Sequence, residues 1–502
     1  MANPLALYPA AGAAELARSN RTTRGLVLLF GFAGVALALV YAAVAWATWG
    51  FEYGLLNVVT AAALAVLLGV VVLKKDYDLT EPLSLVMLAV GVGTTLKPAY
   101  VLFGPREAWP YLLLDRPDPL FLLTPALIVA IAMTMLAVGY VAFNPRSLMG
   151  RVAILRPRAW NGRRLAVVAV AAFSLSLVAM ALYIEKLGIV NILDNISGKR
   201  SFEGEGYSTS LGYYRWVASL TQPALLVSLA WALHRFRRIP TPIAMALAAL
   251  AFTAIVFPFF NSSRTGIVTI LLQSFIVWRC VRGRLPKGVV LSFSLAVLAI
   301  LLIVTALRPK RTTTADLDVT EAIGLDLAIE LTVGGRHFLD LTRTSHVIAG
   351  VPDKLRYQYG QTYFTWVTTP IPRSMWPEKP TLGSGPIIGP RIFGTSGSGV
   401  PPGLVGELYL NFGYIGIVFG AFVMGALLRF VHEQFRPYLP TPAGAVLYAC
   451  VAIPLGWNAV TGDFSRMVVA ALTDIVPVLV AIGFVATGAV ARRRSRAAPR
   501  PR

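Results

Sequence analysis

"YGLLNVVTAAALAVLLGVVVL" (Tyr53–Leu73) contains no charged side chain over its whole length. A helix needs about 20 consecutive apolar residues to cross the hydrocarbon core of a bilayer. Runs of this kind recur along the 502-residue chain, which is 56% hydrophobic and 14% charged, with a mean hydropathy of +0.67. A soluble protein carries about a quarter charged residues. The sequence therefore predicts an all-α polytopic integral membrane protein.

The apolar runs predict about twelve transmembrane helices. They fall at residues 25–48, 53–73, 82–103, 120–143, 165–184, 216–234, 242–260, 266–281, 288–307, 404–428, 442–460 and 467–490. The chain then divides into residues 1–307 with nine spans, a long extracytoplasmic loop at 308–403 containing short helices, three spans at 404–490, and a basic cytoplasmic tail at 491–502. The first run has no convincing cleavage site, so we expect it to be a signal-anchor helix.

The positive charges orient these spans. With an even number of spans both termini lie on one side, and the whole net charge of +21 falls on the tails and loops of that side. Cytoplasmic loops of membrane proteins carry an excess of lysine and arginine. We therefore expect both termini in the cytoplasm and the 308–403 loop outside it. Because this charge is a topology signal, it predicts no nucleic-acid partner.

Cysteines and histidines are too few and too scattered for a metal centre. The two cysteines, Cys280 and Cys450, are expected in different environments, and the chain has only four histidines. We therefore expect no disulfide and no metal site.

Arginines are predicted to gather at the outer face. In "PFFNSSRTG" (Pro258–Gly266), Arg264 lies in a tight turn between two spans. Other basic residues expected at this face are Arg215, Arg308, Lys310, Arg311, Arg336, Arg343, Arg373 and Arg466. Such charges repel one another unless an anion lies between them, and guanidinium suits phosphate. We predict a site for an anionic lipid head group such as a diphosphate. The alternative is pairing with acidic side chains.

Two ionisable residues, Lys97 and Asp474, fall inside predicted spans. They either pair with each other or carry chemistry, since intramembrane charges are functional candidates by default. In the long loop, Asp340 has the helical spacing to pair with Arg336 and Arg343.

The stretch "PPGLVGELYLNFGYIGIVFG" (Pro401–Gly420) places Glu407 and Asn411 on one helix face, beside Tyr409 and near the long loop. A carboxylate there is either a general base for a sugar hydroxyl or a counter-ion to an arginine. In "PIPRSMWPEKP" (Pro370–Pro380), prolines hold Arg373 and Trp376 in an extended pose. We interpret this segment as one wall of a substrate site, with the rigid loop brace as the alternative.

The segments "NSSRTG", "IPRSMWPEKP" and "PPGLVGELYLNFGYIG", with the late long loop, resemble the Wzy-type polymerases of O-antigen and exopolysaccharide repeat units. The resemblance implies a metal-independent GT-C-type glycosyltransferase of the bacterial inner (plasma) membrane, which needs no nucleotide sugar or soluble cofactor. Donor and acceptor would be undecaprenyl-diphosphate-linked oligosaccharides on the outer leaflet, among membrane lipids and with a chain-length regulator protein as a partner. Arg264 and the long-loop arginines would neutralise the leaving diphosphate, and Glu407 is our candidate base.

Two alternatives remain. An O-antigen ligase-type transferase would use the same donor, and the pairs Arg336–His337 and Arg343–His346 are compatible with it. A flippase or other transporter would use Lys97 and Asp474 as coupling residues. The sequence shows no inverted repeat, and transporters with midplane sites rarely need so long an outer loop.

Overall fold

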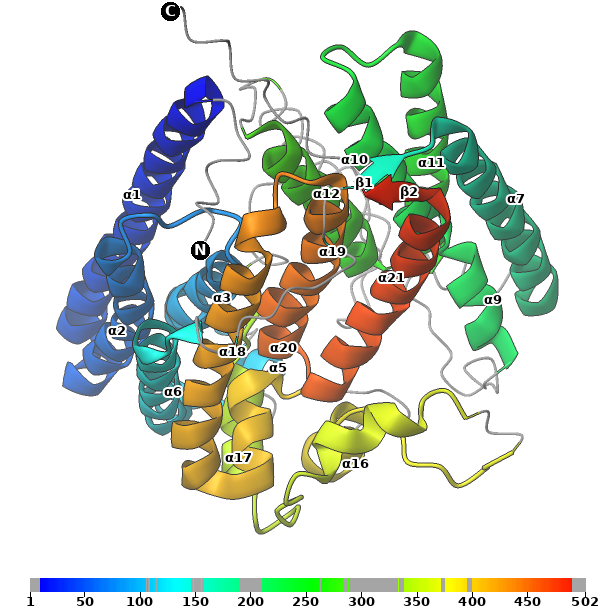
Figure 1. Cartoon of the computed structure of the whole chain (residues 1–502). Coiled ribbons are helices and arrows are strands. Elements are labelled where there is room, and N and C mark those ends of the chain that lie inside the picture. The colour runs from blue at the N-terminus through cyan, green and yellow to red at the C-terminus, as the bar shows by residue number, and fades with distance from the viewer. Residues whose placement is uncertain are drawn as a thin grey trace, which may run out of the picture.

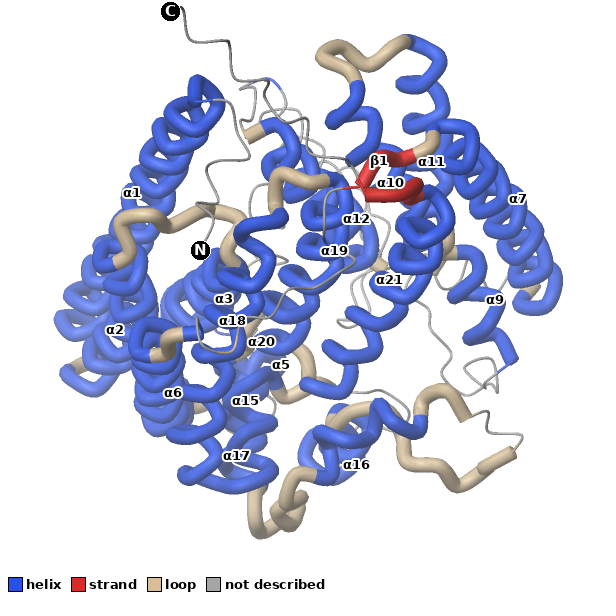
Figure 2. The backbone as a smooth tube through the Cα atoms, viewed as in Figure 1, coloured by secondary structure: helices blue, strands red, loops and turns tan. Residues whose placement is uncertain are grey.

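The computed structural model describes residues 10–104, 106, 109–113, 115–145, 148, 155, 158–188, 210–261, 263–283, 288, 333, 338–371, 375–394 and 400–489. This part of the chain is helical almost throughout (Figures 1 and 2). A single antiparallel pair joins β1 (Arg158–Trp160) to β2 (Ala486–Ala489) within it. The predicted all-α polytopic membrane class is confirmed.

The α-helices are α1 (Ala10–Trp49), α2 (Phe51–Leu73), α3 (Pro82–Val90), α4 (Lys97–Phe103), α5 (Trp109–Leu113), α6 (Leu123–Ala142), α7 (Gly162–Leu187), α9 (Ser210–Ala218), α10 (Thr221–Arg235), α11 (Thr241–Phe260), α12 (Arg264–Arg282), α15 (Leu341–Gly350), α16 (Gly385–Phe393), α17 (Gly403–Ile415), α18 (Ala421–Phe435), α19 (Pro442–Ile453), α20 (Ala459–Thr461) and α21 (Phe464–Val485). Three π-helical turns, η2 (Gly91–Leu96), η9 (Gly416–Gly420) and η11 (Pro454–Asn458), interrupt spans. The 3₁₀ turns are η4 (Pro119–Leu122), η8 (Gln361–Thr368) and η10 (Arg436–Tyr438).

Eleven helical stretches among the described residues are long and apolar enough to cross a membrane. They match eleven of the twelve predicted spans, including the short one, which runs from Thr265 to Arg282. Residues 289–307 of the predicted 288–307 span lie outside the described residues.

The tenth span differs from its prediction as one continuous helix. Gly413 has φ 59° and ψ −141°, so the helix breaks there. A Cβ added at Gly416 or Gly420 would collide with Leu408. Residues 408 and 420 would be about 18 Å apart along a continuous helix. The chain therefore reverses at Gly413, and the first part of α17 packs back against η9.

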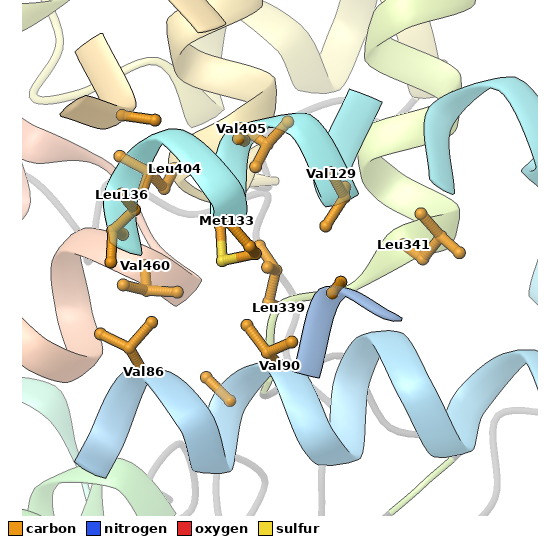
Figure 3. Close-up of a cluster of buried hydrophobic side chains, with 14 of the residues drawn as sticks. Val86, Val90, Val129, Met133, Leu136, Leu339, Leu341, Leu404, Val405 and Val460 are labelled. Atoms are coloured by element: carbon orange, nitrogen blue, oxygen red, sulfur yellow. The ribbon is translucent and has the colours of Figure 1, made fainter. Parts of the chain in front are cut away.

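A large hydrophobic core ties the start of α15 to the bundle. Figure 3 shows Leu339 and Leu341 among side chains of α3, α6, α17 and α20. The approach is close because Gly93, in η2, lacks a side chain where the Leu339 backbone passes. Thr94 donates a hydrogen bond to the Leu339 carbonyl at 3.2 Å. These contacts fix the segment around Leu339 of the long loop on the third span.

Helices α6 and α18 pack through glycines. A Cβ at Gly139 would collide with the Phe422 backbone, and one at Gly425 with the Leu136 backbone. Small residues allow helix backbones to approach closely within a membrane. This contact anchors α18, which follows the chain reversal at Gly413.

Candidate functional site

The end of the long loop folds over one end of the bundle. In Figure 1, α16 and α17 lie at the end opposite β1 and β2. The Gly403 amide donates to the Gly462 carbonyl at 2.9 Å, so α17 begins beside the junction of α20 and α21. We call the polar residues gathered here, Glu407, Asn411, Thr362 and Asp463, the carboxylate site.

Glu407 is the centre of this site. Its side chain is 2% exposed. It accepts hydrogen bonds from the Thr362 hydroxyl at 2.9 Å and from the Phe464 backbone amide at 2.7 Å. Because Thr362 belongs to the long loop and Phe464 starts α21, this carboxylate joins three segments that are distant in sequence.

Asn411 supports Glu407 from the next turn of α17, so the predicted shared face is confirmed. Its Nδ2 donates to the Thr362 hydroxyl and to the Glu407 carbonyl, both at 2.8 Å. Its Oδ1 accepts from the Gly360 amide at 2.9 Å. The Thr362 hydroxyl therefore accepts a hydrogen bond from Asn411 and donates one to Glu407. These two bonds fix the orientation of the hydroxyl.

No described lysine, arginine or histidine forms an ion pair with Glu407, so the counter-ion interpretation finds no partner in this part of the chain. A second carboxylate stands close by, because Asp463 directly precedes Phe464. Burial raises the pKa of the Asp463 carboxyl above its ordinary value, although the adjacent Arg466 acts to lower it. Two carboxylates are thus held together in a buried place where charge is costly.

Arg466 is the predicted arginine that the structure places at this site. Its Nε lies 3.3 Å from Asp463 Oδ2, and Asp463 Oδ1 caps α21 by accepting from the Arg466 amide at 2.9 Å. The Arg466 side chain is 40% exposed. A guanidinium that is anchored at one edge and open at another is suited to bind an oxyanion.

Gly383, in the long loop, leaves the space that the Asp463 carboxylate occupies. It has φ +77°, and a Cβ there would collide with both carboxylate oxygens of Asp463. Its amide donates to the Thr365 hydroxyl at 2.9 Å. Glycine meets both demands, because it tolerates positive φ and leaves room for the carboxylate.

A second, ionic cluster fastens residues 340–343 of the long loop to the third span and includes the predicted Asp340–Arg343 pair. Lys97 Nζ lies 2.8 Å from Asp340 Oδ1, and Arg343 Nε lies 3.1 Å from Asp340 Oδ2. Of the two roles predicted for Lys97 and Asp474, the mutual pair is wrong: Lys97 pairs with Asp340, whereas the Asp474 carboxylate accepts a hydrogen bond from Gln273 at 2.7 Å. Burial acts to raise the pKa of Asp340, but the charges of Lys97 and Arg343 outweigh it and lower that pKa.

Arg343 was predicted to bind substrate, and its surroundings show a different role. Besides Asp340, it donates to the carbonyl oxygens of Pro401 at 3.0 Å and of Phe338 at 3.3 Å. Arg343 therefore ties the two ends of the described loop together, and these acceptors engage its Nε and both Nη atoms.

Three further predicted positions can be placed. Tyr409 is buried on the other face of α17, against Tyr357 and Tyr414, so its packing does not leave it open to a sugar. Trp376 is 41% exposed and stays available for stacking. Arg215 lies half-buried on α9.

The remaining predicted basic residues are not placed. Arg308, Lys310, Arg311, Arg336 and Arg373 lie outside the described residues. The backbone of Arg264 is placed, and it starts α12 behind a Ser263 cap whose hydroxyl accepts from the Gly266 amide at 3.2 Å. The side chain of Arg264 lies outside the described part of the chain.

His346, considered for a ligase-type reaction, is buried on α15. Its Nδ1 lies 2.8 Å from the Thr342 carbonyl, and its ring packs against Phe121 and Phe393. Its Nε2 lies 3.4 Å from Asp115 Oδ1. These contacts give His346 a packing role between the loop and the start of the fourth span.

No group of three or more histidine, cysteine or acidic side chains with metal-binding geometry occurs among the described residues. No family model, no curated protein and no solved structure matches the chain. The function therefore has to be argued from the site.

Proposed function

We propose that the protein is a membrane glycosyltransferase that polymerises undecaprenyl-diphosphate-linked oligosaccharide repeat units into O-antigen or exopolysaccharide. The observation that carries this proposal is Glu407, a buried carboxylate held by neutral donors at the contact of the long loop with α17 and α21. A carboxylate fixed in this way, with no cation paired to it among the described residues, retains oxygen lone pairs to accept a proton.

The reaction assigns a role to each part of the carboxylate site. A hydroxyl oxygen of the acceptor sugar attacks the anomeric carbon of the donor glycan, and its proton passes to Glu407. The bond from that carbon to the diphosphate oxygen breaks, and the electron pair leaves with the undecaprenyl diphosphate. Thr362, Asn411 and the Phe464 amide hold the Glu407 carboxylate in place for this transfer.

Negative charge grows on the leaving diphosphate, and cations fixed beside it lower the barrier. Arg466 is the placed candidate for this role, since Asp463 anchors its Nε and the rest of the guanidinium is partly exposed. Arg264 and Arg373 are the other candidates, from the resemblance of their segments. Arg343 is withdrawn from this set, because Asp340 and two carbonyl oxygens hold it.

The same proposal places the site at the outer face of the bacterial inner membrane, with both termini in the cytoplasm. The excess of basic residues in the tails and alternate loops supports this orientation. The transporter alternative would use Lys97 and Asp474 as coupling residues. It is less favoured because these two residues belong to separate clusters.

Purified protein in lipid nanodiscs tests the proposal directly. Incubation with lipid-linked repeat units alone should give a ladder of products that differ by one repeat. A ligase-type transferase would leave the units unextended until a different acceptor, such as lipid A core, is added. Unchanged units under both conditions would contradict the proposal.

A further inference from the structure

Three polar side chains from three spans meet inside the bundle, apart from the carboxylate site. Gln273 Nε2 on α12 donates to Asp474 Oδ2 on α21 at 2.7 Å. Gln222 Nε2 on α10 donates to Gln273 Oε1 at 2.7 Å and lies 3.3 Å from Asp474 Oδ2. One carboxylate and two carboxamides thus form a closed group, which we call the midplane group.

The group lies at the middle of the membrane-spanning region. Asp474 is near the centre of the span Phe464–Val485, Gln273 near the centre of Thr265–Arg282, and Gln222 near the centre of Gly212–Arg235. Three independent spans therefore bring their polar residues to the same depth. At that depth water is scarce and polar groups must satisfy one another.

The sixth span tightens by a two-residue turn at this point, while backbone hydrogen bonds continue across it. Helix α9 ends at Ala218 and α10 begins at Thr221, with Gln222 in its first turn and Pro223 next to it. The Thr221 hydroxyl is fully buried and has no hydrogen-bond partner among the described residues. The open hydroxyl is an observation independent of the Asp474 contacts.

The midplane group has no positive charge in the described part of the chain. None of the ion pairs there includes Asp474, and Lys97 is held by Asp340. Cys450 on α19, fully buried, is a titratable neighbour but brings no cation. An ionised carboxylate at the bilayer centre is energetically costly unless a cation compensates it. Two neutral carboxamides do not remove that charge.

We propose that Asp474, Gln273 and Gln222 form a binding site for a monovalent cation, a proton or a sodium ion, that neutralises Asp474. The oxygen and nitrogen of each carboxamide exchange places by rotation, so the group can offer amide donors to a protonated Asp474 or amide oxygens to sodium. The bound cation stabilises the packing of α10, α12 and α21 at the midplane. This site needs neither donor nor acceptor glycan and is separate from the proposed polymerisation.

Thermal unfolding of the purified protein in nanodiscs, followed by tryptophan fluorescence, tests the site. One series replaces choline chloride by sodium chloride at constant ionic strength, and a second lowers the pH at constant sodium. A cation that binds only the folded protein raises Tm by an amount on the order of 2 °C for each tenfold increase in its concentration above Kd. A response to sodium identifies sodium as the ligand, and a response to pH alone identifies a proton.

Asp474→Asn should abolish the response, and Asp353→Asn, an exposed aspartate in the long loop, should leave it unchanged. Gln273→Leu retains the carboxylate but removes one ligand. It should shift the midpoint of the response about tenfold, which keeps the test valid if Asp474→Asn does not fold. Identical sodium and pH responses in the wild type, Asp474→Asn and Gln273→Leu would overturn the proposal.

Discussion

Replacing Asp340 by asparagine should strongly destabilise the protein, because this carboxylate neutralises two buried cations. Lys97 Nζ lies 2.8 Å from one oxygen and Arg343 Nε 3.1 Å from the other, and all three side chains are at most 6% exposed. A single pair at such a distance is worth about 6 kcal/mol at an effective dielectric constant of 20. Removing one partner of a buried pair costs about 3–5 kcal/mol, because the other charge is left uncompensated.

The assay is thermal or denaturant unfolding of protein purified in detergent. Asp340→Asn should lower the unfolding free energy by roughly 3–5 kcal/mol. The double variant Asp340→Asn/Lys97→Met should recover part of this loss, because it removes one of the unpaired charges. Asp76→Asn is the matched control: Asp76 pairs with Arg436, but its side chain is 52% exposed, so the loss should be about 0–1 kcal/mol.

The pH dependence follows from the same cluster. Lys97 and Arg343 lower the pKa of Asp340 below its ordinary value of 3.8. An acid whose pKa is lower in the folded state adds stability above its unfolded pKa and loses it as pH falls below that value. The contribution of Asp340 to the free energy of unfolding should therefore be constant at neutral pH and decline below about pH 4. An Asp340→Asn variant within 1 kcal/mol of the wild type at pH 7 would refute the assigned role of this cluster.

The remaining predictions concern the carboxylate site and its arginines. Arg264→Ala should abolish long glycan chains while the protein still inserts; a normal ladder on a polysaccharide gel would exclude Arg264 from catalysis. Arg373→Lys should be nearly as damaging as Arg373→Ala if the guanidinium binds diphosphate with two hydrogen bonds, and full activity of the lysine variant would indicate charge pairing alone. Gly383→Ala should lower Tm and activity together, because its φ of +77° and the adjacent Asp463 leave no place for a Cβ. Wild-type Tm in that variant would show that the loop can move away from Asp463.

The positions of the spans could be predicted from sequence because a run of about 20 apolar residues indicates a membrane-spanning helix without any knowledge of its partners. The reversal at Gly413 was missed because the apolar character continues across it, and hydropathy does not record chain direction. The partner of Lys97 was missed for a related reason. Depth alone suggested Asp474, whereas the contact with Asp340 depends on how the loop returns to the third span.

The carboxylate site was predicted in part. The spacing of Glu407 and Asn411 on one helix face follows from helix geometry, and the structure confirms it. Thr362 lies 45 residues from Glu407, and nothing local in the sequence indicates that contact. Asp463 carries a signal that was available: an aspartate directly before an apolar helix is a preferred N-cap.

The turnover of a Glu407→Gln variant is the most direct test of the proposed function. Purified wild-type protein, Glu407→Gln and the exposed control Glu52→Gln, at the start of α2, would each receive lipid-linked repeat units in nanodiscs, with donor binding measured separately. We expect full ladders from the wild type and Glu52→Gln. For Glu407→Gln we expect a loss of turnover of about 10²–10⁴-fold with donor affinity retained, the range typical of general-base catalysis. A wild-type ladder from Glu407→Gln, or a loss of donor affinity without a loss of turnover, would contradict the assignment of Glu407 as the base.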